Sequence, residues 1–343
     1  MARETYLPII RRVPTLAGRA VILPRRQILY LVAGAAVLPA GSRSANAQTY
    51  PTRPVHIVAA VPPGNGPDIL ARLVGQRLSE RLGQRFIVDN RPGADDNIGI
   101  EFVVRAPADG YTLLLIPTSA VTNASLYPNL SFNFIRDIAA VACIGRTPFV
   151  LVVHPSLQIT TVPEFITYAK ANPGKINMAS SGIGSGNHVF GTLFALMAGV
   201  EFVHVPYRSS YIPDLLAGRV QICFSPVELV IDSIQSGRLR ALGVTTTKPL
   251  AVLPNVPTIN QFLPGYEAAG WNGVGAPGNT PDEIIELLNK QVNAVITEPG
   301  VKARLDNLGI EPVPMTPMEF GKSLADESEK WAKVIGAAHI KAE

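Results

Sequence analysis

Short apolar runs alternate with amphipathic segments along the chain from residue 54 onward. The first run covers residues 55–61 and ends in a Pro/Gly turn. Residues 68–82 then carry apolar side chains at 69, 70, 73, 74, 78 and 82, which form one face of a helix that ends at Gly83. Repetition of this unit is typical of parallel βαβ folds. We expect further strands at residues 86–88, 111–116, 149–153, 176–179, 202–205, 221–224 and 241–245.

Polar residues mark where several helices begin. Thr161, Thr280 and Thr316 each stand three residues before a glutamate, which is the spacing of a capping box. Asn97 is expected to cap the helix after the turn at 90–93. The last helix passes through Trp331 to residue 338 with an apolar stripe suited to packing. With 343 residues, 47% of them apolar, the chain can form about two α/β domains.

The first 47 residues have the features of an export signal. Basic residues precede an apolar stretch at 28–38, and Ala45-Asn46-Ala47 before Gln48 has the form that signal peptidase cleaves. Arg25-Arg26 also fits a twin-arginine signal, and the general route is equally compatible. A basic disordered leader and an N-terminal membrane anchor are the alternatives. We expect cleavage near Ala47 and a periplasmic protein.

Removal of this segment changes the charge of the protein. Residues 1–47 hold seven Arg and one Glu, so the whole-chain charge of +4 falls to −2 in the remainder. The pI of about 9.1 therefore mostly describes the leader. A nucleic-acid partner loses its main support, because no basic face is implied once the leader is gone.

The two cysteines, Cys143 and Cys223, lie in apolar runs that read as strands. A free Cys in such a place behaves as a small buried hydrophobe. A disulfide is also open in an oxidising compartment, since spacing does not show whether the two side chains meet. Two cysteines this far apart have no zinc-site spacing.

Four loops follow strands at the edge where parallel sheets bind ligands. Residues 62–68 (PPGNGPD) lead into a helix N-terminus, which offers free N–H groups to an anion; a tight turn explains the same residues. Thr118 and Ser119 follow the third strand as small donors. Residues 180–188 hold three Gly without dinucleotide-binding spacing and form a neutral anion cradle. Arg208 has a fork suited to a carboxylate, or is a surface arginine.

No group of residues in the sequence has the complete pattern of a catalytic site. Ser185 lies between two Gly but lacks a complete nucleophile elbow, and His188 three residues later fits a helix start as well as a base. The five histidines are dispersed, and none has metal-ligand spacing. We therefore expect no catalytic residue, no metal and no cofactor.

The order of these motifs resembles the extracytoplasmic solute receptors of tripartite tricarboxylate transporters, the Bug-type family. The resemblance runs from about Tyr50 to the C-terminus. It rests on YPTRPVHIV (50–58), PPGNGPDILAR (62–72), NRPGADDNIG (90–99), DGYTLLL (109–115), NPGKINMASSGIGSGNH (172–188), AGVEFVHVPYR (198–208), GRLRALGVT (237–245), LPNVPT (253–258) and the closing IKAE.

The resemblance implies an α/β, two-lobed periplasmic binding protein of type II-like architecture. Each lobe would be a mainly parallel sheet flanked by helices, with crossing strands as the hinge. Lobe I would hold residues 48–149 and 268–343, and lobe II residues 150–267. A ligand carboxylate would bind between the lobes, and the receptor, a monomer, would deliver it to the membrane subunits of a transporter.

Ligand-binding residues follow from the same resemblance. They are Gly64, Asn65, Gly66 and Asp68 in lobe I and Ser181, Gly184, Ser185 and His188 in lobe II, with Tyr207 and Arg208 nearby and Thr118 and Ser119 added from their loop.

Three departures from the family pattern bear on the ligand. Asn65 and Pro67 stand in a loop that is usually PPGGGTD, Asp95-Asp96 replaces a Gly-Gly pair, and the loop after Arg208 is about two residues shorter. Two other functions stay open: a sensor of the same fold that docks on a membrane kinase, and a secreted hydrolase using Ser185 and His188.

Overall fold

The computed structural model describes residues 50–127 and 129–342. The predicted export signal and its cleavage site near Ala47 lie outside these residues.

Elements of the first lobe are the strands β1 (Val55–Ala59), β2 (Phe86–Asn90), β3 (Thr112–Ile116) and β10 (Glu311–Pro312), and the helices α2 (Gly66–Leu82), α3 (Asn97–Val104), α4 (Ala120–Leu126), α5 (Phe134–Asp137), α10 (Asp282–Ile296), α11 (Pro299–Asn307) and α12 (Pro317–Ala337).

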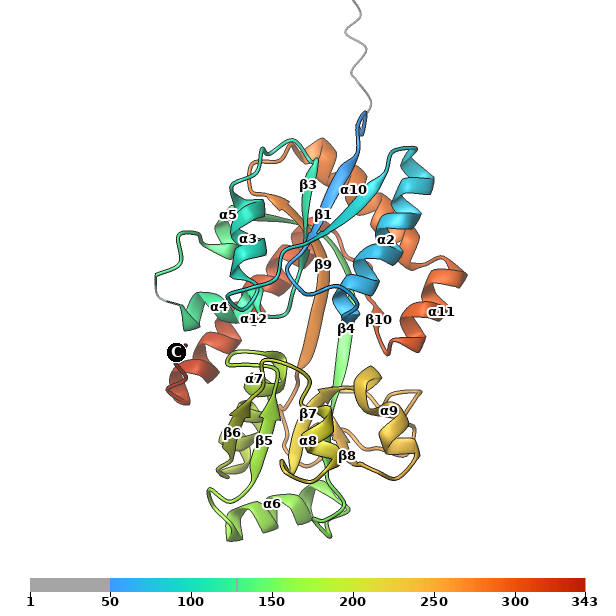
Figure 1. Cartoon of the computed structure of the whole chain (residues 1–343). Coiled ribbons are helices and arrows are strands. Elements are labelled where there is room, and N and C mark those ends of the chain that lie inside the picture. The colour runs from blue at the N-terminus through green and yellow to red at the C-terminus, as the bar shows by residue number, and fades with distance from the viewer. Residues whose placement is uncertain (1–49, 128, 343) are drawn as a thin grey trace, which may run out of the picture. The chain divides into compact units, whose positions relative to one another are not determined.

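The second lobe is built in the same way from a smaller set of elements. Its strands are β5 (Asn177–Ser180), β6 (Val203–Pro206), β7 (Ile222–Pro226) and β8 (Arg240–Val244), and its helices are α6 (Val162–Ala171), α7 (Gly186–Ala198), α8 (Ile212–Leu216), α9 (Val227–Gln235) and the 3₁₀ turn η1 (Ile259–Gln261). Two strands, β4 (Ile138–Val153) and β9 (Ala269–Pro277), run between the two groups of elements (Figure 1).

One continuous sheet joins the lobes in the order β2-β1-β3-β9-β4-β7-β5-β6, and β8 and β10 also pair with β4. The β2-β1-β3 and β7-β5-β6 groups are parallel within themselves. β4 pairs with β9 up to Pro148 and with β7 from Phe149 onward, always antiparallel. The two-lobed α/β fold with crossing strands is therefore confirmed. The residue boundaries of the lobes stay a prediction.

The crossing strands differ most from the sequence prediction. The pattern predicted a strand at residues 149–153 and a separate strand-like run around Cys143, whereas both belong to the 16-residue strand β4. Gly145, Arg146 and Pro148 interrupt the apolar pattern between the two runs, and the strand is continuous because β9 and β10 pair with it there. All of β9 is buried although it is rich in glycine. Gly273 is needed there because a Cβ would collide with the ring of Phe320.

The predicted helix starts have mixed outcomes. Thr316 and Glu319 form a complete capping box on α12, and at α6 Thr161 accepts from the Glu164 N–H. The predicted box at Thr280 is wrong: Pro281 is the N-cap residue of α10, and the Thr280 hydroxyl has no hydrogen-bond partner among the described residues. Asn97 is also wrong as a cap, because Asp96 occupies the N-cap position and Asn97 is buried, accepting from Asn123.

The C-terminal helix α12 ties the lobes together. Its Trp331 is fully buried, and its ring lies 5.0 Å from the ring of Phe190 on α7. Lys330 donates to the backbone oxygen of Glu267 at 2.7 Å, close to where β9 leaves the second lobe. A hydrophobic cluster runs continuously from Val58 and Leu114 to Phe165 and Phe224 through this region.

Cys143 in β4 and Cys223 in β7 are both buried and both unpaired. Burial raises the pKa of each thiol to about 12, so neither is a reactive thiolate near neutral pH. In the part of the chain that the structure covers, no helix is both long and apolar enough to span a bilayer.

Candidate ligand-binding site

The loop after β1 is held by its own aspartate. Asp68, 2% exposed, accepts from the Gly64 N–H at 2.8 Å, from Arg72 Nε at 3.0 Å and from Asn90 Nδ2 at 2.8 Å. Burial alone would raise the pKa of this carboxyl, but the hydrogen bonds from Arg72, Gly64 and Asn90 outweigh it and lower the pKa. Both oxygens and the Gly64 N–H are thus used within lobe I. Asp68 therefore stabilises the conformation of the loop, and a ligand would have to bind to the residues next to it.

Those neighbours are Asn65 and Gly66. Asn65 is the N-cap residue of α2 with extended backbone, and its exposed side chain makes no capping bond. Gly66 opens the helix, followed by Pro67, which has no N–H. Because the first turn of a helix leaves N–H groups unpaired, Gly66 and Asp68 present backbone donors here.

The second-lobe loop at 180–188 is also internally braced. Ser185 Oγ donates to the backbone oxygen of Gly182 at 2.7 Å, and the Gly184 N–H donates to His188 Nδ1 at 3.1 Å. Ser185 and His188 therefore point to separate partners, which weighs against their use as nucleophile and base. Gly184, with φ +79°, has no room for a side chain because a Cβ would collide with Leu126 of lobe I.

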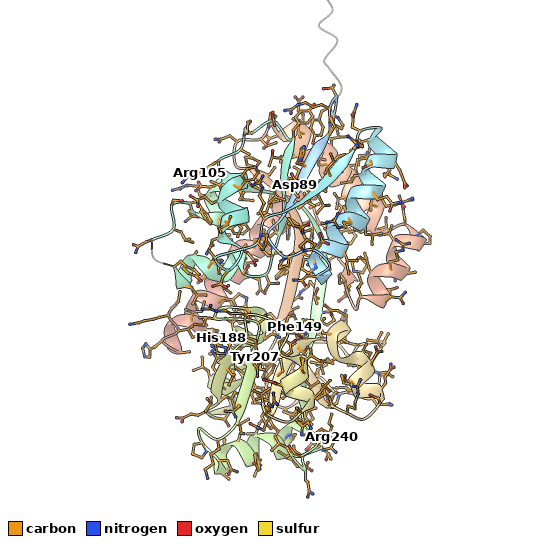
Figure 2. The ribbon with its side chains drawn as sticks, viewed as in Figure 1. Asp89, Arg105, Phe149, His188, Tyr207 and Arg240 are labelled. Carbon is orange, nitrogen blue, oxygen red and sulfur yellow. The ribbon has the colours of Figure 1, made fainter. Side chains whose placement is uncertain are left out.

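His188 is stacked on a second histidine that the sequence analysis missed. The rings of His188 and His204 lie 3.6 Å apart with an interplanar angle of 1°, and His204 Nε2 lies 2.6 Å from Ser180 Oγ. Burial, with the neighbouring His204, lowers the pKa of His188 to about 3, and burial lowers that of His204 to about 4. Both rings are neutral near pH 7. Figure 2 shows His188 and Tyr207 in the second lobe near Phe149, where β4 enters that lobe.

A buried polar network lies beneath the same loop. Ser181 Oγ donates to Asn187 Oδ1 at 2.8 Å, and Asn187 Nδ2 donates to the Phe224 oxygen at 2.8 Å and contacts the Tyr211 hydroxyl at 3.2 Å. Tyr211 lies 2.8 Å from Ser225 Oγ. The Ser181 hydroxyl is therefore hydrogen-bonded within lobe II. Asn187 fixes the start of α7 through its contacts with Phe224 and Tyr211.

Loops of the two lobes meet at several points. Thr122 Oγ1 of α4 lies 3.1 Å from the Gly184 oxygen. A Cβ at Gly182 would lie 3.7 Å from Asp95 Oδ1, and one at Gly66 would lie 3.6 Å from Glu228 Oε1. We call residues 62–68, 93–97 and 117–122 of lobe I and residues 180–188 and 226–228 of lobe II the facing loops. The predicted residues of loops 62–68 and 180–188 belong to this set.

Thr118 and Ser119 lie on the lobe I side of the facing loops. A Cβ at Gly270 of β9 would lie 3.0 Å from Thr118 Oγ1, which places Thr118 against the crossing strand. Ser119 donates to Asp96. Burial raises the pKa of Asp96 to about 6, with the Ser119 hydrogen bond opposing the shift and the charge of Asp95 adding to it.

Tyr207 and Arg208 are at the periphery. The Tyr207 hydroxyl donates to Asp214 Oδ2 of α8 at 2.9 Å, and Asp214 in turn is paired with Arg219 at 2.8 Å. Burial and this bond raise the pKa of Tyr207. Arg208 is exposed, and within the described ranges it forms no hydrogen bond or ion pair.

Glu228 is the residue of the facing loops that sequence reasoning did not find. It is the second residue of α9, directly after β7. Its Oε2 is buried without a hydrogen-bond partner in the described structure. Burial raises the pKa of this carboxyl to about 7, against the effect of its own backbone N–H. The signal was an acid in a helix first turn, which is ordinary and gave no reason to single it out.

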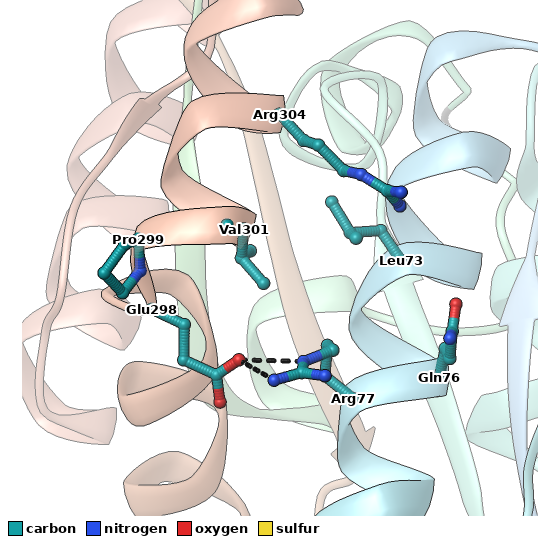
Figure 3. Close-up of a pocket in the computed structure, with 8 residues that line it drawn as sticks. Leu73, Gln76, Arg77, Glu298, Pro299, Val301 and Arg304 are labelled. Carbon is teal, nitrogen blue, oxygen red and sulfur yellow. Dashed lines mark hydrogen bonds and ion pairs between the residues drawn. The ribbon is translucent and has the colours of Figure 1, made fainter.

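Hollows are also found away from the facing loops. One, of about 420 Å³, lies between α2 and α11 on lobe I, and Arg77 and Glu298 form an ion pair at its side (Figure 3). A larger groove of about 810 Å³ runs along β4 between β10 and the loop after β8, and is lined by Arg146, Lys248 and Trp271 among others. Neither contains a predicted site residue. Residues 50–127 and 129–342 hold no group of three His, Cys, Asp or Glu arranged for a metal.

A family model described as the tripartite tricarboxylate transporter family receptor matches residues 70–340. The chain belongs to this receptor family. The family consists of solute-binding receptors, and the resemblance drawn from the motifs is confirmed. The receptor is 34% identical over 313 residues to protein BugT of Bordetella pertussis, with 90% of this chain and 96% of that protein covered.

Solved structures of similar proteins share its fold. A Rhodopseudomonas palustris protein, Rpa4515, solved with adipate, is 36% identical with a TM-score of 0.78, covering 85% of this chain and 99% of its own. MatC of the same species, solved with bound malate, is 25% identical with a TM-score of 0.74, covering 83% of this chain and all of its own. The receptor therefore has the fold of periplasmic solute-binding proteins.

Proposed function

We propose that this receptor captures a small organic acid between the facing loops in the periplasm and delivers it to the membrane subunits of a tripartite tricarboxylate-type transporter. The observation that carries the proposal is that strand-to-helix loops from opposite lobes meet in two pairs, Gly184 before α7 with Thr122 of α4, and Gly66 of α2 with Glu228 of α9. Each pair brings the N-terminus of one longer helix, α7 or α2, to the boundary between the lobes. Free N–H groups and the positive end of the helix dipole favour a carboxylate there.

The similar structures with adipate and malate support a carboxylate ligand. Within the facing loops, the donors that support this proposal are the backbone N–H groups of Gly66, Asp68, Gly186 and Asn187 rather than charged side chains. Arg208, which is exposed after β6, is proposed as an outer contact for the ligand. Ser185 and His188 are proposed to line the site rather than to catalyse.

A thermal-shift screen of mono-, di- and tricarboxylates, amino acids and aromatic acids, with neutral solutes as controls, tests the proposal. A ligand at 100 times its Kd stabilises the fold by about 2.7 kcal/mol, which is well resolved. We expect only acids to raise the melting temperature, and Arg208→Ala to weaken binding severalfold while the protein stays folded. Stabilisation by neutral or cationic solutes alone would contradict the proposal. Co-purification with transporter subunits rather than with a membrane kinase tests the delivery step.

A further inference from the structure

Glu228 lies at the interface of the lobes with half of its hydrogen-bonding capacity unused. Oε1 faces the first residue of α2, since a Cβ on Gly66 would lie 3.6 Å from it. Oε2 is buried without a partner in the described structure. A buried carboxyl oxygen without a donor costs on the order of 1–3 kcal/mol, and more when it is charged. This cost is removed when a binding partner donates a hydrogen bond to the carboxyl.

We propose that Glu228 is a specificity-determining residue that accepts a hydrogen bond from the ligand, and that the ligand therefore carries an ammonium or amide group in addition to its carboxylate. The inference rests on the proposed function. It names which organic acids the receptor takes: amino or amido acids in preference to plain dicarboxylates.

The position of Glu228 fits this role. It lies opposite the first turn of α2, and the N–H groups of that turn belong to the proposed carboxylate site. The start of α9 is held firmly, because Val227 is 1% exposed and its Cβ lies 3.8 Å from the position of a Cβ on Gly309 of lobe I. A ligand whose carboxylate is held at the first turn of α2 therefore lies beside Glu228, whose backbone is fixed.

The charges of the facing loops argue for a donor rather than a second carboxylate. Their sequences contain the acids Asp68, Asp95, Asp96 and Glu228 and no lysine or arginine. Asp68 is balanced by Arg72, and Asp95 and Asp96 accept hydrogen bonds from Tyr127 and Ser119. Glu228 has neither a cation nor a donor from another residue among the described groups. A second ligand carboxylate beside it would add like-charge repulsion, whereas an ammonium or amide would satisfy it.

Matched acids of four, five and six carbons give the test. At each length the set contains the dicarboxylate, its monoamide, the ω-amino acid and the plain monocarboxylate. Binding to the purified receptor is measured by calorimetry at pH 7.5. We expect the amide or the amino acid to bind at least tenfold more tightly than the dicarboxylate of the same length. Glu228→Gln should reduce the affinity for the amino acid at least tenfold and leave that for the dicarboxylate unchanged or improved.

The control is Glu283→Gln, which removes an exposed first-turn glutamate from α10. Its neighbour Ile284 lies against Gly110, before β3, at the opposite end of the sheet from the facing loops. This variant should bind every acid as the unmodified receptor does. Melting temperatures of both variants confirm folding.

The outcomes separate the two proposals. If dicarboxylates bind most tightly and Glu228→Gln changes no affinity, the role of Glu228 is overturned while the proposed function stands. If no acid of any length binds, the proposed function fails and the inference fails with it. A loss of amino-acid binding in Glu228→Gln together with retained dicarboxylate binding supports both.

Discussion

Asp68 and Glu228 are two acids in equivalent places with opposite surroundings. Each stands in the first turn of the helix that follows a strand, one in each lobe, and both belong to the facing loops. Asp68 receives donors from Gly64, Arg72 and Asn90, and its pKa is lowered. Glu228 receives none from another described residue, and burial raises its pKa to about 7.

The difference shows that the helix position of an acid does not determine its role. The dipole of a helix N-terminus favours either carboxylate by only about 0.3–1 kcal/mol. Neighbouring donors decide the rest, because each hydrogen bond to the charged form stabilises it while burial opposes it. The hydrogen bonds of Asp68 all come from its own lobe, so its role is structural. One carboxyl oxygen of Glu228 has no hydrogen-bond partner within the described protein, which is the property expected of a ligand contact.

Replacing Asp68 should have the largest effect. Asp68→Asn keeps the shape but removes the charge that pairs with Arg72 and turns one acceptor into a donor, which opposes the Gly64 N–H or Asn90 Nδ2. We expect a loss of about 3 kcal/mol in the free energy of unfolding, measured by urea denaturation. The matched variant Asp89→Asn alters an acid that pairs with His56 near the surface and should cost under about 1 kcal/mol. A loss below about 0.5 kcal/mol in Asp68→Asn would show that the loop does not depend on this network.

The stacked histidines should cause most of the loss of folding stability at acidic pH. The stability that they contribute falls as the pH falls, the opposite of the trend expected for Glu228. In the unfolded chain a histidine titrates near 6.5, whereas the folded pKa values of His188 and His204 are about 3 and about 4. The stability they contribute is present above pH 6.5 and is lost as the pH falls toward these folded values. Between pH 7 and pH 5 we expect each of the two histidines to lower the stability by about 2 kcal/mol.

Chemical denaturation of His204→Asn at both pH values checks this, with His154→Asn as the control outside the stack. The decrease should be smaller in His204→Asn and unchanged in His154→Asn. Equal decreases in all three proteins would show that other titrating groups cause the loss of stability between pH 7 and pH 5.

Much of the fold was predictable from the sequence because its parallel units have clear periodicity. The α2 pattern at 68–82 with Gly83 as its end, and the capping box at Thr316, are local signals, and the structure has both. The joining of the run around Cys143 with residues 149–153 into one strand, and all of β9, were not predicted. Their glycines, such as Gly273 beneath Phe320, reflect close packing between distant segments, which no local pattern contains.

For the candidate site, the sequence predicted two of the facing loops but not what each side chain contacts. The loops at 62–68 and 180–188 could be found because they follow parallel strands and open helices. That Asp68 is used internally depends on Asn90, 22 residues away, and the stacking of His188 depends on His204 in another strand. Glu228 matters only because Gly66 of the other lobe faces it. These relations are set by tertiary structure.

The pH dependence of Glu228 tests the comparison with Asp68 most directly. The unfolded carboxyl ionises near 4.5 and the folded one at about 7, so only the unfolded state releases its proton in between. Stability therefore falls as the pH rises through this window, the reverse of the trend expected for Asp68, whose folded pKa is lowered. Glu228→Gln cannot ionise, and it should be more stable than the unmodified receptor by about 3 kcal/mol at pH 8 and by nothing measurable at pH 4.5. Asp96, with its pKa raised to about 6, titrates in the same direction in both proteins, so the difference between them isolates Glu228. A variant less stable at pH 8 would mean that the carboxylate has a partner in the folded protein, and the contrast between the two acids would fail.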